Sequence, residues 1–406
     1  MASSHELDVA RTFARAVSAA REMWGPGWRP DRAAVAPGRI EILGNHVDYN
    51  GGPVLAAAID RATVALSDGC GNPEFLFADF LSDGPVRLDL QAGSLEAASP
   101  GSPRPSDFAL GVAARSRENG KDLCVGRTVV ATSIPIGSGM SSSAALCVAL
   151  TLLMNADPLS GAELVYDAQA AENWTGVPCG TMDQAASVFG QVIRYEGPEG
   201  TTSVAPDLAT YCFVVVDSRV ERTLGTSSYP IRVAECAEAV RRLERAWDRP
   251  IGNLAALTPH DFDAIERAEP PVLEPHLQAR VRHIVTEIGR VGAGEVAMGE
   301  QDWVAFGALM NESGASSAGD YAISHPQVEA LVEVMRGVPG VAGARMMGGG
   351  EGGSTLALLR FDALDALRAD LVDFFDDESM RSSVVPLSFA PGARRMTDRE
   401  IAALLQ

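Results

Sequence analysis

The sequence is short of basic residues. Its 406 residues include 33 lysines and arginines against 53 aspartates and glutamates, which gives a formal net charge of −20 at pH 7. Nucleic acids and anionic membrane surfaces are polyanions, so bulk electrostatics oppose the binding of either partner. An anionic ligand would therefore need a local pocket built from backbone N–H groups, an arginine or a metal ion.

The sequence also lacks an apolar run of the roughly 18 residues that a membrane-spanning helix requires. Its first eight residues, Met1 to Asp8, carry acids and lack the basic start and the apolar centre of a secretion signal. We therefore predict a cytoplasmic protein that has no membrane partner.

Cysteine is scarce as well, with six residues and no CxxC spacing among them. This pattern predicts reduced thiols and no structural zinc site. Histidines at the i, i+4 spacing of a metal site are also missing. We expect surface positions for most of the following: His46, His260, His276, His283 and His325.

The composition, 46% apolar and 21% charged, is typical of a globular protein, and the length suffices for two domains. Apolar periodicity predicts helices at 6–23, 107–118, 144–155, 160–173, 181–189, 230–247, 277–290, 301–314 and 326–336. It predicts strands at 33–43, 53–67, 74–80, 127–134, 191–195, 211–216, 343–347 and 354–361. Asn50-Gly51 indicates a hairpin turn, 93–106 a loop, and 210–230 the boundary between the domains.

One segment, Ala36 to Gly52, concentrates an arginine, an imidazole, a carboxylate and a phenol between two glycine turns. Its apolar flanks predict burial, and a buried polar group without a partner costs about 1–3 kcal/mol. A small, hydroxyl-rich ligand explains so many polar groups more easily than mutual pairing does. The alternative is a turn whose polar residues cap the neighbouring elements.

A second segment, Gly137 to Ala145, has the order strand, glycine-serine loop, helix. Glycines let the backbone approach a ligand, and N–H groups at a helix N-terminus attract an anion. The loop is not a Walker A motif, because no Gly-Lys-[Ser/Thr] follows, and it lacks the third glycine of a dinucleotide fingerprint. It therefore predicts a phosphate site of another kind, with serines that only cap the helix as the alternative.

A formal GxGxxG occurs at Gly348, Gly350 and Gly353, but a strand-like segment follows it instead of the required helix. We therefore exclude a dinucleotide-binding domain, and the lack of HRD and DFG motifs excludes a protein kinase.

Two acids follow the glycine-serine loop in the sequence. Asp183 opens a predicted helix, and Glu172 lies eleven residues earlier on the helix before it. Asp183 could simply favour the positive end of its helix. If both acids converge on the loop, they could bind a metal ion, and two carboxylates with a phosphate loop suggest phosphoryl transfer.

These motifs, in this order, resemble those of the GHMP small-molecule kinases, and of the galactokinases above all. Ala36–Gly52 resembles the galactokinase motif, Pro135–Ala145 the phosphate loop of the family, and Met347–Ser354 its third glycine motif. Further similar segments are Glu172–Gln184, Ser228–Arg232 and Leu309–Ser313. The resemblance covers roughly residues 30 to 360.

The resemblance implies an α+β fold of two domains, residues 1–212 and 213–406, with the active site in the cleft between them. It implies transfer of phosphate from ATP to the anomeric hydroxyl of galactose or a related aldose. Asp183 would lie against that hydroxyl as a general base or an electrostatic anchor, and Arg39 would bridge toward the transferred phosphate. The implied partners are the sugar and ATP, with no nucleic acid, and the protein would be a monomer or a homodimer.

The resemblance also assigns the binding residues. Ser143 and Glu172 would hold Mg²⁺. The sugar would contact Asn45, His46, Asp48, Gly180 and Tyr229. The nucleotide would contact Gly137, Ser138, Gly139, Met140, Ser141, Ser142 and Ser143, with Gly349 and Gly350 closing the site.

Asn45 departs from the family pattern, because galactokinases usually carry glutamate at this position, against the hydroxymethyl end of the sugar. An amide both donates and accepts hydrogen bonds and carries no charge. We therefore hypothesise a substrate altered or extended beyond C5, with galactose itself as the alternative. Two rival functions stay open: a pathway-specific anomeric kinase for an octose in antibiotic biosynthesis, and a non-catalytic galactokinase-like sugar sensor. Glu351 is a second departure, since its charge would repel phosphate unless the side chain points away.

Overall fold

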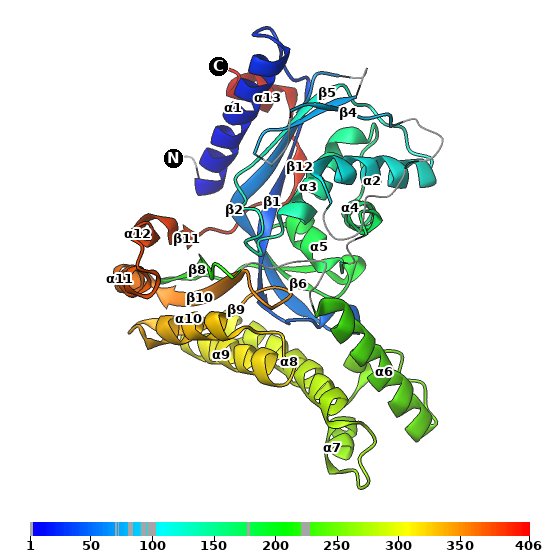
Figure 1. The fold of residues 1–406 in the computed structure, drawn as a ribbon, viewed down its shortest axis with the longest axis vertical. Helices are drawn as coiled ribbons and strands as arrows, with labels where there is room; N and C mark the ends of the chain where they lie inside the picture. The colour runs from blue at the N-terminus through cyan, green and yellow to red at the C-terminus, as the bar shows by residue number, and fades with distance from the viewer. Residues whose placement is uncertain are drawn as a thin grey trace.

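The computed structural model describes residues 3–69, 71, 73–79, 84–90, 95, 103–176, 179–220 and 228–406. Two sheets with their helices lie one above the other in Figure 1, and the long strands β1 and β2 run from the upper layer toward the lower one. Most of the predicted loop 93–106, part of the predicted boundary 210–230, and Cys70 lie outside the described residues.

The helices are α1 (Ser4–Trp24), α2 (Pro105–Glu118), α3 (Ser142–Met154), α4 (Gly161–Trp174), α5 (Met182–Phe189), α6 (Tyr229–Trp247), α7 (Pro259–Arg267), α8 (Pro275–Gly299), α9 (Trp303–Gly319), α10 (Pro326–Gly337), α11 (Leu364–Phe375), α12 (Met380–Ser383) and α13 (Asp398–Leu404). The strands are β1 (Arg32–Leu43), β2 (Val54–Ser67), β3 (Glu74–Phe77), β4 (Val86–Arg87), β5 (Arg127–Thr132), β6 (Val192–Tyr195), β7 (Thr202–Val204), β8 (Tyr211–Asp217), β9 (Val341–Met346), β10 (Ser354–Arg360), β11 (Pro386–Leu387) and β12 (Arg394–Arg395).

The larger sheet has the order β12-β1-β2-β5-β3-β4, with β6 pairing to β2 and β7 to β6. Successive side chains of a strand point to opposite faces, and β1 follows this rule. Ala33 and Val35 pack in the core under α1, whereas Ala34 and Ala36 pack in the core that holds α3. Helices therefore cover both faces, and β1 is buried along nearly its whole length.

The smaller sheet has the order β11-β8-β10-β9, and all of its strand pairs are antiparallel. Helices α9 and α10 pack against β9, and α8 packs against α9. After β11 the chain returns to the larger sheet, where β12 pairs with β1 and α13 packs beside α1 (Figure 1). The residues after β11 therefore pack with the N-terminal sheet, although the predicted division assigns all of 213–406 to the C-terminal domain.

The predicted helices and strands overlap elements of the structure throughout, but four helices are missing from the prediction: α7, α11, α12 and α13. The predicted two-residue turn at Asn50-Gly51 is wrong in its extent. Strands β1 and β2 do pair antiparallel, but residues 44–53 connect them through a 3-10 turn at Asp48–Asn50. The connection is long because it carries the polar residues of the candidate site.

One prediction about a residue type is also wrong. Cys124 is disulfide-bonded, so the cysteines are not all reduced, whereas Cys147, Cys179, Cys212 and Cys236 are free thiols. Among the five histidines named above, His260 and His276 are exposed and His325 is half-buried, as expected for most of them, but His46 and His283 are buried. Both histidines pack where the connection between β1 and β2 meets the C-terminal helices, an arrangement that their spacing in the sequence could not indicate.

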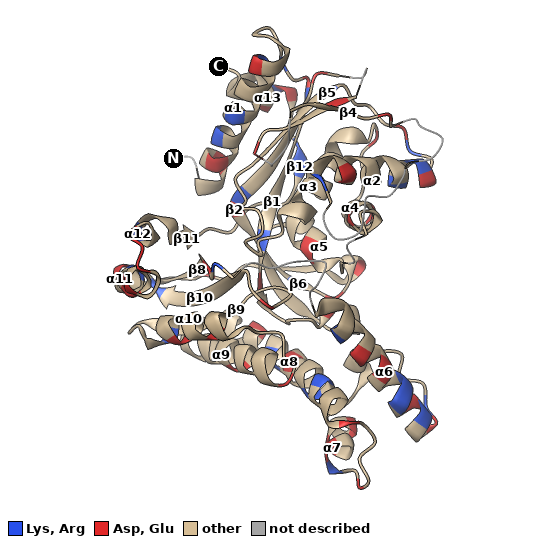
Figure 2. Ribbon diagram, viewed as in Figure 1, with Lys and Arg blue, Asp and Glu red and all other residues tan. Residues whose placement is uncertain are grey.

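Charged residues are frequent on the outer helices, α6 and α7 above all, and sparse along the strands (Figure 2). No helix within the described part of the chain is long and apolar enough to cross a bilayer. The charges inside the fold are therefore exceptional, and several of them lie at the candidate site.

Candidate active site

Arg39 and Asp183 form the centre of the site. The Nε and Nη2 atoms of Arg39 donate to the two carboxylate oxygens of Asp183 at 2.8 and 2.7 Å. Arg39 lies on β1 between two irregularities in the pairing with β2, and such bulges often redirect a side chain toward a site. Asp183 lies in the first turn of α5, where the helix dipole favours a negative charge. The pair therefore joins β1 to α5.

The glycine-serine loop closes over this pair. Gly137, Gly139 and Ser141 have φ values of 80°, 73° and 56°, and the residues between them have negative φ. Such alternation turns successive backbone N–H groups inward to form an anion-binding nest. The Ser141 hydroxyl donates to Asp183, and the Nη1 atom of Arg39 donates to the carbonyl of Gly139. The backbone N–H of Arg39 donates to the carbonyl of Met140 at 3.1 Å. The loop and the Arg39–Asp183 pair are therefore one hydrogen-bonded unit.

Ser138 and Ser142 complete the loop. The Ser138 hydroxyl donates to the carbonyl of Pro135 at 2.6 Å, which closes the turn before the nest. Ser142 opens α3, so its backbone lies at the positive end of a 13-residue helix. Ser138 therefore shapes the anion site through its hydroxyl, and Ser142 through its backbone.

Ser143 and Glu172, the predicted metal ligands, lie together. The Ser143 hydroxyl hydrogen-bonds the carboxyl group of Glu172, and Gln184 Nε2 donates to that group at 2.7 Å. Burial raises the pKa of Glu172 to about 7, because no cation within the described residues compensates its charge fully. Mg²⁺ is usually bound by one or two carboxylates together with substrate phosphates, so this donor set fits a magnesium ion.

Asp48 and Gly180 meet close to Asp183. A Cβ atom on Gly180 would lie 2.1 Å from Asp48 Oδ2, so only glycine leaves room for this carboxylate. Burial raises the pKa of Asp48 to about 6, and the negative charges of Asp183 and Glu41 add to the effect. Two acids so close together favour a ligand that donates hydrogen bonds, as sugar hydroxyls do.

Aromatic rings surround His46. Its ring centroid lies 5.3 Å from that of Tyr229, at the start of α6, and 5.0 Å from that of Tyr321. His46 Nδ1 and the Tyr49 hydroxyl are 2.9 Å apart, and the hydroxyls of Tyr49 and Tyr321 are 2.7 Å apart. The structure thus brings His46 and Tyr229 together from segments far apart in the sequence.

Asn45 lies differently from the prediction. Its side chain is fully buried and points toward the C-terminal domain. Nδ2 donates to Glu41 Oε2 at 3.0 Å and to the carbonyl of Gly348 at 2.9 Å, and Oδ1 accepts from the Ser317 hydroxyl at 3.1 Å. The Asn45 amide thus bonds to groups of the protein itself, and Glu41 provides a negative charge beside it. This geometry removes the reason for assigning Asn45 to the sugar.

The third glycine motif lies against the phosphate loop. A Cβ atom on Gly139 would be 3.9 Å from the carbonyl of Met347, and one on Gly353 would be 3.9 Å from the carbonyl of Gly137. A Cβ atom on Gly350 would lie 2.4 Å from the carbonyl of Ile323, so Gly350 tolerates no side chain. The neighbouring Gly349 is partly exposed.

Glu351, inserted in this third glycine motif, points away from the phosphate loop. Its carboxylate accepts the backbone N–H of Ser228, just before α6, at 2.9 Å. Its charge is therefore directed to the start of a helix, where a carboxylate is stabilising.

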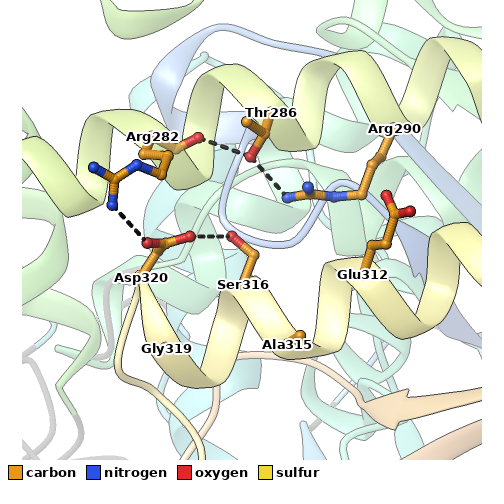
Figure 3. A pocket seen from close by; sticks show the side chains of 8 residues that line it. All are labelled: Arg282, Thr286, Arg290, Glu312, Ala315, Ser316, Gly319 and Asp320. Carbon is orange, nitrogen blue, oxygen red and sulfur yellow. Dashed lines mark hydrogen bonds and ion pairs between the residues drawn. The ribbon is translucent and has the colours of Figure 1, made fainter. Parts of the chain in front are cut away.

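Sequence reasoning missed the residues that support these loops from the C-terminal half. Arg345 is fully buried on β9 and donates to Glu41 Oε1 at 2.7 Å. Glu287 and His283 are fully buried on α8 and contact the backbone of Gly44 and Asn45. Their signal in the sequence is weak, because charged residues on an amphipathic helix are usually exposed. A groove of about 390 Å³ between α8 and α9 (Figure 3) lies outside the predicted site.

Three family models match the chain. The galactokinase galactose-binding signature matches residues 26–67, the GHMP kinase N-terminal domain residues 108–191, and the GHMP kinase C-terminal segment residues 295–377. The first match contains Arg39 and Asp48, the second contains the phosphate loop with Glu172 and Asp183, and the third contains the third glycine motif.

Relatives of known name match over most of their length. A galactokinase of Roseiflexus is 34% identical and is aligned over 88% of this chain and 91% of its own. The human galactokinase is 34% identical, over 89% and 92% of the two chains. These matches confirm the predicted family, and with it a galactokinase-like phosphotransferase that has an alcohol group as acceptor and uses ATP with Mg²⁺.

Solved structures agree. Lactococcus lactis galactokinase, crystallised with galactose, superposes with a TM-score of 0.78 at 26% identity, over 94% of this chain and 98% of its own. The mevalonate kinase of L. major has a TM-score of 0.59 at 17% identity over 89% and 98% of the chains, which supports the predicted fold alone. The chain therefore belongs to the galactokinase family of the GHMP kinases.

Proposed function

We propose that this protein transfers the γ-phosphate of ATP to the anomeric oxygen of galactose or of a closely related aldose. One observation carries the proposal. The Arg39–Asp183 pair is hydrogen-bonded to the phosphate loop through Gly139 and Ser141, and it lies beside Asp48 of the sugar motif. A sugar hydroxyl held against Asp183 would therefore face a phosphate held by the loop.

In this proposal, Asp183 orients the anomeric hydroxyl. Both of its oxygens already accept hydrogen bonds from Arg39, and one accepts from Ser141 as well. With its oxygens held in this way, Asp183 acts mainly by positioning the hydroxyl and stabilising positive charge, as in other phosphoryl transfers. Arg39 then holds Asp183 and offers its guanidinium edge toward the charge that develops on the transferred phosphate.

The nucleotide phosphates would lie in the nest of Gly137 to Ser143, with Gly349 and Gly350 closing the site from the third glycine motif. Glu172 and Ser143 would hold Mg²⁺. The ion, when bound, supplies a positive charge that neutralises phosphate oxygens. Hydrogen bonds from Ser143 and Gln184 orient the Glu172 carboxylate for that purpose.

The sugar would be bound by Asp48, His46, Tyr229 and the backbone of Gly180. In this proposal, Asp48 accepts hydrogen bonds from neighbouring hydroxyls of the sugar. The aromatic rings around His46 pack against the apolar face of the sugar ring. Because the Asn45 amide is fully buried and both its nitrogen and its oxygen bond to the protein, nothing in this geometry favours a sugar extended beyond C5. The relatives do not favour the octose kinase or the non-catalytic sensor either.

We also propose three broader features. Since the reaction consumes ATP, the protein works in the cytoplasm, which cell fractionation would test. It is a monomer or a homodimer, which light scattering would decide. Its first domain ends near residue 212, where β8 of the smaller sheet begins, and its second domain follows from residue 213.

The decisive experiment measures ADP release over a sugar panel that includes D-galactose and an octose. Asp183→Asn should lower turnover at least about a hundredfold while ATP binding survives, since one charge-assisted contact in the transition state is worth roughly that much. Asp398→Asn is the matched control, because Asp398 also lies in a first helical turn but is exposed. Activity with the octose alone would favour the pathway-specific kinase. Binding of sugar and ATP without turnover would favour the sensor.

A further inference from the structure

The turn that carries the sugar motif is held from outside its own domain. Gly44 and Asn45 follow β1 directly, and the helix α8 of the C-terminal half runs across them. We propose that Glu287 on α8 is a positioning residue that fixes this turn, and through it the sugar-binding side chains of His46 and Asp48. The inference rests on the proposed function, because it concerns how the same site binds its sugar.

Both oxygens of the Glu287 carboxylate accept hydrogen bonds from the protein. Its Oε1 atom accepts the backbone N–H groups of Gly44 at 2.9 Å and of Asn45 at 3.2 Å, together with the Ser313 hydroxyl at 2.6 Å. Its Oε2 atom accepts from Arg290 Nε at 2.6 Å. Two successive N–H groups directed at one oxygen form an anion-binding nest, with Glu287 as the anion.

His283, one helical turn before Glu287, holds the other side of the same residue. Its Nε2 atom lies 3.0 Å from the carbonyl oxygen of Asn45, and its Nδ1 atom lies 3.0 Å from the Ser316 hydroxyl. Residues i and i+4 share one face of a helix. His283 and Glu287 therefore clamp both the carbonyl and the N–H of Asn45, and we call this pair the α8 clamp.

The turn needs such support. Gly44 has a φ of 103°, and a Cβ atom there would lie 2.8 Å from the Cα of Val54. His46 has a φ of 60°, a left-handed conformation that a side-chain-bearing residue rarely adopts. The Asn45 peptide thus connects two residues of unusual backbone geometry. Loss of the clamp would let the turn relax and would move His46 and Asp48 away from the sugar.

The α8 clamp depends on the charge of Glu287. Burial by itself would raise the pKa of this carboxyl, but the neighbouring His283, Arg290 and Arg345 outweigh that effect and hold the pKa at about 2. Arg290 reaches Glu287 from the groove between α8 and α9, where Thr286 supports it (Figure 3). Glu287 therefore stays ionised over the whole range in which the protein would work.

The test is Glu287→Gln, which keeps the shape of the side chain and removes its charge. We expect the KM for the sugar to rise about tenfold or more, because weaker hydrogen bonds hold the turn. The kcat and the KM for ATP should stay within about threefold, because Glu287 touches neither nucleotide nor reacting atoms. Glu312→Gln is the matched control, since Glu312 is exposed and lines the groove beside Arg290.

A second measurement separates positioning from mere stability. Hydrogen exchange at the amides of Gly44 and Asn45 should be faster in Glu287→Gln than in the control variant. A lower fraction of folded protein would reduce the apparent kcat and leave the sugar KM unchanged, and that result would overturn the proposal. Unchanged exchange and an unchanged sugar KM would overturn it as well.

If Glu287→Gln does not fold, His283→Phe keeps a ring of similar size and removes the donor to the Asn45 carbonyl, and the same rise in sugar KM is expected. If the wild-type protein turns over no sugar, the proposed function fails, and the exchange measurement then decides on the clamp independently.

Discussion

Replacing Arg39 by lysine is the sharpest test of the site, because it keeps the charge and removes the geometry. The guanidinium donates two parallel hydrogen bonds to Asp183 and a third to the carbonyl of Gly139. A lysine ammonium is a point charge on a flexible stem and cannot make the planar, forked contact. It can reach one oxygen of Asp183 at best, so two of the three hydrogen bonds are lost.

The expected size of the effect follows from those bonds. A hydrogen bond to a charged group contributes about 1.5–3 kcal/mol, and the lower end applies here because 28% of the Asp183 side chain is exposed to solvent. Two lost bonds therefore cost about 3 kcal/mol. Since 1.36 kcal/mol corresponds to a factor of ten in rate, we expect kcat/KM to fall by roughly a hundredfold.

The assay is steady-state ADP release with saturating ATP and varied galactose, together with thermal unfolding. Arg61→Lys is the control, because Arg61 lies on the neighbouring strand β2 and pairs with Asp60 at 3.3 Å. The control should keep wild-type rates. If Arg39→Lys turns over within about threefold of the wild type at an unchanged melting temperature, the forked contact is not needed and the proposed role of Arg39 is wrong.

Three other predictions concern buried charges. The pKa of Glu172 is raised to about 7, so the ligand-free protein should lose stability as the pH rises from about 4.5 through 7, and MgATP should reverse this loss. If the melting temperature of Glu172→Gln varies with pH in the same way as that of the wild type, the assignment is contradicted. The pKa of Asp48 is raised to about 6, so the sugar KM should rise as the pH falls through 6, because a protonated carboxyl loses an acceptor; a flat profile between pH 5 and 8 would refute its role. Arg345→Met leaves Glu41 buried without its cation and should lower the free energy of unfolding in urea by about 3–5 kcal/mol. Adding Glu41→Gln to this variant should recover part of the loss, and equal stability of the single and the double variant would show that the pair is not coupled.

Much of the fold could be predicted because its signals are local. The helix α3 follows the glycine-serine loop, and β1 and β2 read as long apolar strands. The missed helices carried signals too: α11 buries Leu364, Leu367 and Leu371 at helical spacing, and α7 begins with a capping box at Thr258. The return of β12 to the larger sheet could not be predicted, because a two-residue strand is defined only by the partner it meets.

The site divides in the same way. Arg39, Asp183 and the phosphate loop could be predicted because the chemistry of each motif is contained in a short segment, although their roles stay predictions. The position of Asn45 could be named but its contacts could not. Its side chain meets Gly348 and Ser317, which are about 300 and 270 residues away in the sequence. Only the fold decides whether such an amide faces the protein or a ligand.

Four carboxylates around the candidate site fall into two groups, and the difference separates support from binding. Glu41 and Glu287 each contact an arginine directly, Arg345 in one case and Arg290 in the other, so their charges are neutralised before any ligand arrives. Asp48 and Glu172 have no arginine in an ion pair among the described residues, and burial raises the pKa of both groups. An ionised carboxylate left without a cation in the interior is costly, and such groups concentrate where a ligand or a metal ion completes the site. The first group therefore holds the loops in place, and the second faces the places where a hydroxyl-rich sugar and a magnesium ion would restore the balance of charge.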